Sequence, residues 1–124
     1  MKIGFLGGLE QVGENMTFFE YKDDILIMDA GLVFPGGDMF GVDYIIPDIS
    51  YVKMRKDKVR GLIITHGHLD HIGALKHVLP ALGYPTIYAT NLTIHMIKKI
   101  FEEAKIVKNL KYKVIDPDTD ILKF

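Results

Sequence analysis

The sequence predicts an α/β domain in which short strands come first and helices then alternate with strands. Three observations support this prediction. The start of the chain carries short apolar runs of strand length, separated by glycine or polar turns. Residues 60–79 are typical of a strand, a polar loop and a helix, and residues 86–115 continue with strand, helix and strand. Strands followed by such an alternation favour a sheet covered by helices.

Three strands are expected at the start of the chain. Residues 1–6 form the first, which ends at the glycine pair 7–8; these glycines predict a tight turn, because the spacing of a phosphate-binding loop is absent. Residues 17–21 and 25–29 form the other two, joined by a polar hairpin turn. The apolar run that ends at Met28 is expected to be buried on both faces of the sheet.

A long loop is expected at residues 32–48, where glycine, proline and aspartate are frequent. Such a loop either walls one side of an active-site cleft or packs as an ordinary surface loop, and the sequence favours the two alternatives equally. Asp48 is expected to cap the helix that follows it and to take no catalytic part. Residues 59–65 then form the next strand, which delivers a loop rich in histidine.

After this loop, the apolar spacing over residues 72–82 fits one face of a helix. Pro80 is expected to end or kink that helix near Leu79. His77 and His95 are interpreted as structural residues rather than ligands. The remaining expected elements are a strand at 86–89, a helix capped by Asn91 or Thr90 that carries Leu92 to Ile100, a strand at 111–115 and a solvated turn at 116–120.

The loop after residue 65 concentrates metal-ligating side chains: His66, His68, Asp70 and His71. Neutral imidazole and carboxylate together suit zinc, and also manganese or iron. In extended backbone, residues two apart point the same way, so His66 and His68 can converge on one cation. Asp70 and His71 follow where the chain turns into a helix, and are expected to serve a second cation nearby. Two cations roughly 3.5–4 Å apart can clamp a phosphoryl or acyl oxygen.

The order His-x-His-x-Asp-His at residues 66–71 resembles the signature motif of the metallo-β-lactamase superfamily of di-metal hydrolases. Further segments resemble the opening of the ribonuclease J family, in the β-CASP group of that superfamily: residues 7–16, 28–35, 41–48 and 66–75. The resemblance runs along nearly the whole chain. It implies a partial αββα metallo-β-lactamase sandwich, of which this chain forms the first part.

The resemblance also implies roles for individual residues. His66 and His68 are expected to hold one Zn²⁺, Asp70 and His71 the other, with Mn²⁺ as an alternative metal. Asp70 is also the expected catalytic residue, which orients the attacking water. Asp29 is expected to support the histidine loop through hydrogen bonds rather than to bind metal itself. In the family, the metals activate water to hydrolyse RNA phosphodiesters, as a 5′–3′ exonuclease, an endonuclease or both, in RNA processing and decay.

The chain departs from the family in its ligand set. Ribonuclease J members are several times longer, and their remaining ligands have no evident match before Phe124. Residues 1–124 are therefore expected to be the N-terminal part of a catalytic domain, truncated before those ligands. Zinc normally takes three or four protein ligands, so the chain alone is expected to be inactive.

Composition limits the choice of partners. The formal net charge is −1 and no basic run exceeds Lys98–Lys99, so charge gives no argument for nucleic acid, and RNA is expected from the resemblance alone. The absence of cysteine suits a reducing cytoplasm. No apolar stretch approaches the length of a membrane span, so no membrane partner is expected.

Two alternatives to the nuclease stay open. The first is another hydrolase of the same superfamily that acts on small-molecule esters, lactones or thioesters; residues 66–71 cannot separate these, whereas residues 7–16 and 41–48 favour the nuclease. The second is a non-catalytic fragment that pairs with partner chains or with itself. Uncovered sheet edges and apolar surface would favour a homo-oligomer in that case.

Overall fold

A six-stranded mixed sheet organises the fold, and its strands are paired in chain order. The computed structural model describes residues 1–124. The first three strands run antiparallel to one another, and the last four run parallel. Their bounds are β1 (Lys2–Gly7), β2 (Met16–Tyr21), β3 (Asp24–Met28), β4 (Val59–Ile63), β5 (Ile87–Ala89) and β6 (Tyr112–Val114).

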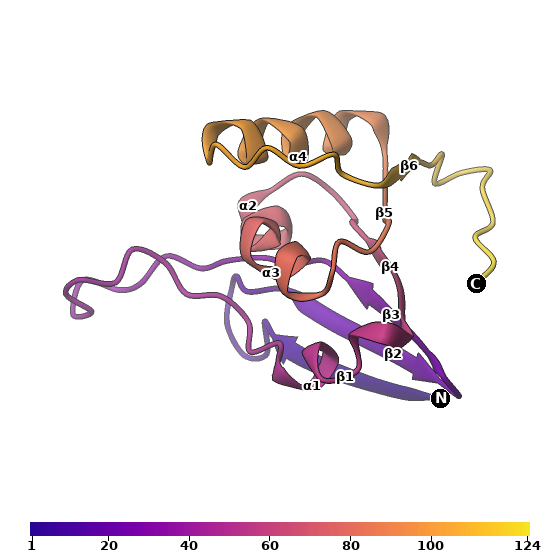
Figure 1. The fold of residues 1–124 in the computed structure, drawn as a ribbon. Helices are drawn as coiled ribbons and strands as arrows, with labels where there is room; N and C mark the ends of the chain where they lie inside the picture. The colour runs from indigo at the N-terminus through magenta and orange to yellow at the C-terminus, as the bar shows by residue number, and fades with distance from the viewer.

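Four α-helices and one 3₁₀ turn connect the later strands (Figure 1). They are α1 (Ser50–Lys53), η1 (Lys56–Lys58), α2 (Leu69–Ile72), α3 (Leu75–Ala81) and α4 (Asn91–Glu103). Each α-helix contributes apolar side chains to a single core, among them Val52, Ile72, Leu79 and Ile97. No helix has both the length and the apolar character needed to cross a lipid bilayer.

The helices cover only one face of the sheet. On β3, Ile25 and Ile27 are completely buried, whereas Leu26 and Met28, which point to the other face, are partly exposed. On β1, Phe5 lies on that same open face and is 57% exposed. The expectation that this run is buried on both faces is therefore wrong, because only one helical layer is present. The result is half of the αββα sandwich that the sequence predicts.

The expected helix over residues 72–82 is divided into α2 and α3 at Gly73. A side chain at Gly73 would press against Leu32 and the Leu69 carbonyl, so glycine at this position lets the segment after β3 pack closely on the junction of the two helices. Pro80 is expected to end or kink the helix near Leu79. In the structure, α3 contains Pro80 and ends at Ala81. Pro80 lies in the last turn, where its missing N–H costs one hydrogen bond and the Leu82 N–H still donates to the Val78 carbonyl at 3.1 Å.

The loop at residues 32–48 is fastened at its base and projects beyond it (Figure 1). Val33 and Ile45 form an isolated bridge with N···O distances of 3.0 and 2.8 Å. The Tyr44 hydroxyl lies 2.7 Å from His77 Nε2 on α3. Between these ties, Phe40 is 92% exposed. The outer part of the loop therefore does not pack against the domain. Beyond the loop, α1 takes Ile49 as its N-cap residue, while Asp48 accepts hydrogen bonds from Ser50.

Candidate metal centre

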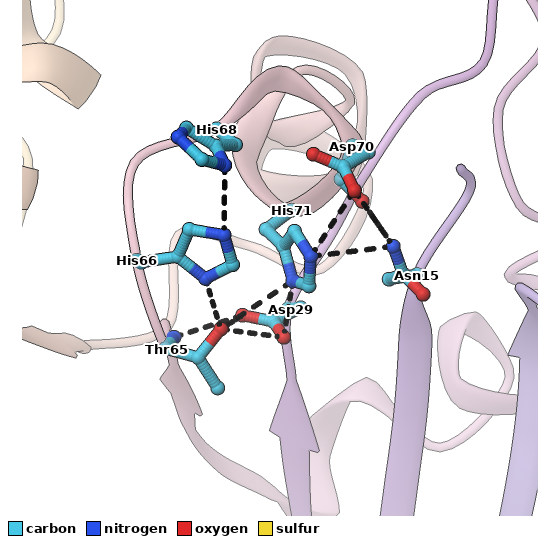
Figure 2. A network of polar contacts seen from close by, with 7 residues as sticks. All are labelled: Asn15, Asp29, Thr65, His66, His68, Asp70 and His71. Atoms are coloured by element: carbon cyan, nitrogen blue, oxygen red, sulfur yellow. Dashed lines mark hydrogen bonds and ion pairs between the residues drawn. The ribbon is translucent and has the colours of Figure 1, made fainter. Parts of the chain in front are cut away.

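The predicted site residues meet at one edge of the sheet because of the strand directions (Figure 2). The parallel strands β3 and β4 end at the same edge, where Asp29 follows the first and residues 65–68 follow the second. Asp70 and His71 lie in α2, directly after that loop. Because β2 is antiparallel to β3, Asn15 at its start reaches this edge as well. Ligand sites of α/β proteins commonly lie outside the carboxyl ends of their strands.

Backbone hydrogen bonds fix α2 against the segment after β3. Ala30 N donates to His71 O at 2.7 Å, and Leu32 N donates to Leu69 O at 3.1 Å. Between them, a side chain at Gly31 would overlap the carbonyl of Asp70. Glycine at this position is what lets the two segments come so close. The Asp70–His71 pair therefore lies on a rigid, main-chain-bonded support.

Asp29 anchors the histidine loop from below. Its side chain is buried, and its carboxylate accepts hydrogen bonds from the Thr65 backbone N–H at 2.9 Å and from Thr65 Oγ1 at 3.0 Å. Its Oδ2 lies 2.8 Å from His71 Nδ1. Since a carboxylate only accepts hydrogen bonds, Nδ1 carries the hydrogen and Nε2 carries the free lone pair. Asp29 thus fixes the ring of His71 with Nε2 directed at Asp70.

Thr65 extends the same arrangement to His66. Because the Thr65 hydroxyl donates its hydrogen to Asp29, its oxygen can accept from His66 Nδ1, 3.1 Å away. His66 Nε2 is then also free, and it lies 3.1 Å from His68 Nδ1. The ring of His66 lies over that of His71, with centroids 4.1 Å apart. All four predicted ligands therefore lie in one cluster, with Asp29 behind them (Figure 2).

The donor atoms form two close pairs. His66 and His68 present nitrogens 3.1 Å apart, and His71 Nε2 lies 3.2 Å from Asp70 Oδ2. Two nitrogens bound to tetrahedral zinc at about 2.0–2.1 Å lie roughly 3.4 Å apart, so each pair needs little adjustment to share a cation. However, no set of three or more such side chains has the arrangement needed to hold a metal ion. The residues fit a divalent cation in their chemistry and pairing, with an incomplete ligand number at each pair.

The charges around the cluster also suit a cation. Asp29 Oδ2 and Asp70 Oδ2 each lie near a ring nitrogen of His71, and neither carboxylate forms an ion pair with a lysine or arginine. With neutral imidazoles the cluster carries the two negative charges of these carboxylates. Uncompensated carboxylates in a partly buried site are costly, and a divalent cation removes that cost.

Sequence reasoning missed two members of this cluster, Asn15 and Thr65. Asn15 Nδ2 lies 3.0 Å from Asp70 O and 3.3 Å from Asp70 Oδ2. The available signals were its position before β2 and its place in residues 7–16, a segment that resembles the ribonuclease J family. Thr65 directly precedes the histidine motif, which could have indicated a supporting role.

His77 and His95 lie outside the cluster, as expected. Burial, and to a lesser degree Lys76, lowers the pKa of His77 below its usual value. His95 Nδ1 lies 2.8 Å from the Asn91 carbonyl within α4. A cavity of ≈ 640 Å³ lies beside the C-terminal end of α4. None of the metal-centre residues lines it, so this cavity is separate from the metal centre.

The sequence profile of the metallo-beta-lactamase superfamily matches residues 9–123. Ribonuclease J of Synechocystis sp. is 39% identical over 117 residues, which cover 94% of this chain and 18% of that protein. Ribonuclease J 2 of Staphylococcus aureus is 42% identical over 119 residues, which cover 96% of this chain and 21% of that protein. The chain thus spans about a fifth of the length of these relatives.

A solved structure gives the same fold. The metallo-beta-lactamase fold protein YhfI from Bacillus subtilis superposes with a TM-score of 0.57 at 18% identity. The match covers 98% of this chain and 47% of that one. At this identity the likeness concerns the fold alone.

Proposed function

The chain belongs to the metallo-β-lactamase superfamily, and from this premise we propose that it forms the first part of a ribonuclease J-like, zinc-dependent nuclease. The similarity to two ribonuclease J proteins confirms the resemblance predicted from the sequence. The cluster of His66, His68, Asp70 and His71, whose donors lie in two pairs at one sheet edge, carries the metal centre, and the named relatives carry its assignment to a nuclease.

In this proposal, His66 and His68 hold one zinc ion, and Asp70 and His71 hold the other. When bound there, zinc supplies an acidified water and a positive charge that polarises a phosphoryl oxygen. Asp70 orients the attacking water through its partly exposed carboxylate. Asp29 keeps the hydrogen on His71 Nδ1 and, through Thr65, favours the hydrogen on His66 Nδ1. Such supporting hydrogen bonds typically change metal affinity 10–100-fold when removed.

We further propose that residues 1–124 are the N-terminal part of the catalytic domain and that other segments supply the missing ligands. Residues 1–124 alone are then inactive. The substrate is RNA, cleaved exonucleolytically from the 5′ end, endonucleolytically or both, during RNA processing in the cytoplasm. The substrate assignment rests on the named relatives, because a net charge of −1 provides no general attraction for phosphates.

Metal content tests the proposal most directly. Purified chain is stripped with chelator, titrated with Zn²⁺ and with Mn²⁺, and compared with His68→Ala and with His95→Ala as a matched control. Because each pair supplies only two ligands, zinc should bind weakly, with close to two equivalents at saturation in the wild type and in His95→Ala, since His95 lies outside the cluster. At least one equivalent should be lost in His68→Ala. A wild-type chain that takes up no zinc even at saturating concentration would refute a metal centre in this chain.

The choice of substrate is tested separately, on a longer chain that includes the missing ligands. Hydrolysis of single-stranded RNA is compared with hydrolysis of a thioester and a lactone under the same metal load. RNA cleavage that is lost in His68→Ala supports the nuclease. Turnover of the small esters without RNA cleavage would favour the other hydrolase.

A further inference from the structure

Asn15 is fastened to both segments that form the metal centre. Its backbone N–H donates to Asp70 O at 3.1 Å, and its carbonyl accepts from Gly31 N at 3.0 Å. Its side-chain Nδ2 lies 3.0 Å from Asp70 O, 3.3 Å from Asp70 Oδ2 and 3.4 Å from His71 Nε2. Figure 2 shows this amide facing the Asp70–His71 pair from the side opposite His66. The amide is therefore part of the cluster, although its sequence position is remote from it.

The amide can have only one orientation here. The atom that faces the cluster meets three acceptors: the Asp70 carbonyl, the Asp70 carboxylate and His71 Nε2. The Asn15 carbonyl oxygen in that place would oppose all three, so the NH₂ group must face them. The Asn15 Oδ1 atom instead packs at Gly8, where a built Cβ would lie 2.8 Å from it.

This NH₂ group resolves a conflict between two acceptors. Asp29 holds the hydrogen on His71 Nδ1, so the lone pair of Nε2 faces Asp70 Oδ2 at 3.2 Å. Two acceptors at this distance repel each other unless a donor or a cation lies beside them. Asn15 Nδ2 donates to the Asp70 carbonyl at 3.0 Å and to the Asp70 carboxylate at 3.3 Å, next to His71 Nε2. The amide is neutral, so it holds the carboxylate in place without taking over the role of the metal ion's positive charge. A lysine at this position would supply a positive charge of its own.

From this geometry we propose that Asn15 is a positioning residue of the metal centre, whose side-chain amide holds the Asp70 carboxylate beside His71 and thereby sets the cation affinity of that pair. This inference rests on the proposed function. It assigns Asn15 no contact with substrate and no metal ligation. Removal of the amide in Asn15→Ala leaves the backbone N–H of Asn15 bonded to Asp70 O, and it removes the side-chain hydrogen bonds to the Asp70 carbonyl and carboxylate.

The test is a Zn²⁺ titration followed by NMR of the imidazole nitrogens, so that each pair is observed through its own ring. In Asn15→Ala, the affinity read from His71 should fall about 10–100-fold, whereas the affinity read from His66 and His68 should stay within about threefold of the wild type. Asn109→Ala is the matched control, because Asn109 is exposed in the loop before β6. Equal losses at both pairs, or no loss at either, would overturn the proposal.

Two further measurements keep the proposal testable whatever the metal affinity. In the metal-free chain, the His71 Nε2 resonance should move in Asn15→Ala and not in Asn109→Ala. An unmoved resonance in Asn15→Ala would overturn the role of Asn15. This outcome does not depend on metal binding, so it is distinguishable from a failure of the proposed function. In the wild type, the Asn15 side-chain amide protons should shift when the Asp70–His71 pair takes up Zn²⁺. Unshifted protons would contradict the proposal without any variant, which covers the case in which Asn15→Ala does not fold.

Discussion

Gly31→Ala is expected to displace the Asp70–His71 pair and to destabilise the domain through a steric clash alone. A Cβ at this position would overlap the carbonyl of Asp70 and would lie 2.9 Å from the Asn15 nitrogen. The segments after β3 and before α3 must therefore separate. Three hydrogen bonds depend on their present spacing: Gly31 N to Asn15 O, Asn15 N to Asp70 O and Asn15 Nδ2 to Asp70 O, all between 3.0 and 3.1 Å.

Each such hydrogen bond contributes about 0.5–1.5 kcal/mol. Forced overpacking costs about 1–3 kcal/mol more. Together these terms predict a loss of roughly 2.5–7.5 kcal/mol, which is a large part of the ~5–15 kcal/mol that keeps a domain folded. Urea denaturation followed by circular dichroism measures the free energy of unfolding.

Gly37→Ala is the matched control, since nothing lies within 4 Å of a Cβ built at Gly37. It should leave stability nearly unchanged. If Gly31→Ala proved as stable as Gly37→Ala and bound zinc equally well, the close approach of Gly31 to Asp70 would not be a requirement of the fold, and the reasoning would be refuted.

Three further results are expected. Asp29→Asn places a donor where Thr65 and His71 both donate, so zinc affinity in a chelator competition should fall about 10–100-fold, and unchanged affinity would contradict the supporting role. Because the pKa of His77 is lowered in the folded chain, this side chain binds a proton more readily in the unfolded chain, so the free energy of unfolding should fall as the pH drops below 6.5. The thermal midpoint should therefore fall more steeply with decreasing pH in the wild type than in His77→Gln, and an equal dependence on pH in the two would argue against His77 as the cause. The open sheet face that bears Phe5 should cause self-association, so sizing at rising concentration should show a larger species that Phe5→Lys reduces, whereas a strictly monomeric wild type would exclude it.

The strands and the ligand cluster were predictable because their determinants are local. The run at residues 25–28 has the length and side chains of a strand, and a polar turn links it to the strand before it. Likewise, the four predicted ligands lie within residues 66–71, so one strand-to-helix junction brings them together. Expectations of this kind need no knowledge of distant parts of the chain.

The features that escaped prediction depend on contacts between distant residues. Asn15 lies 55 positions before Asp70, and an asparagine before a strand is chemically ordinary until its partner is known. The close packing of Leu32 on Gly73 joins residues far apart in the sequence, and the one-sided burial of β3 follows from where the helices lie. Pro80 shows the same limit, because a proline is tolerated wherever the lost hydrogen bond falls in a last helical turn.

The pairing of the strands in chain order has a consequence for the order in which the centre forms. The meander of β1, β2 and β3 needs only short loop closures, whereas β4 must first cross back over the sheet from the end of β3. Short-range contacts generally form faster than long-range ones. We therefore expect Asn15 and Asp29 to be in place before the histidine loop arrives. Pulse-labelled hydrogen exchange during refolding should show protection of the β2–β3 amides before those of residues 71–74. The residues that support the metal centre would then be in place before the metal ligands pack against them.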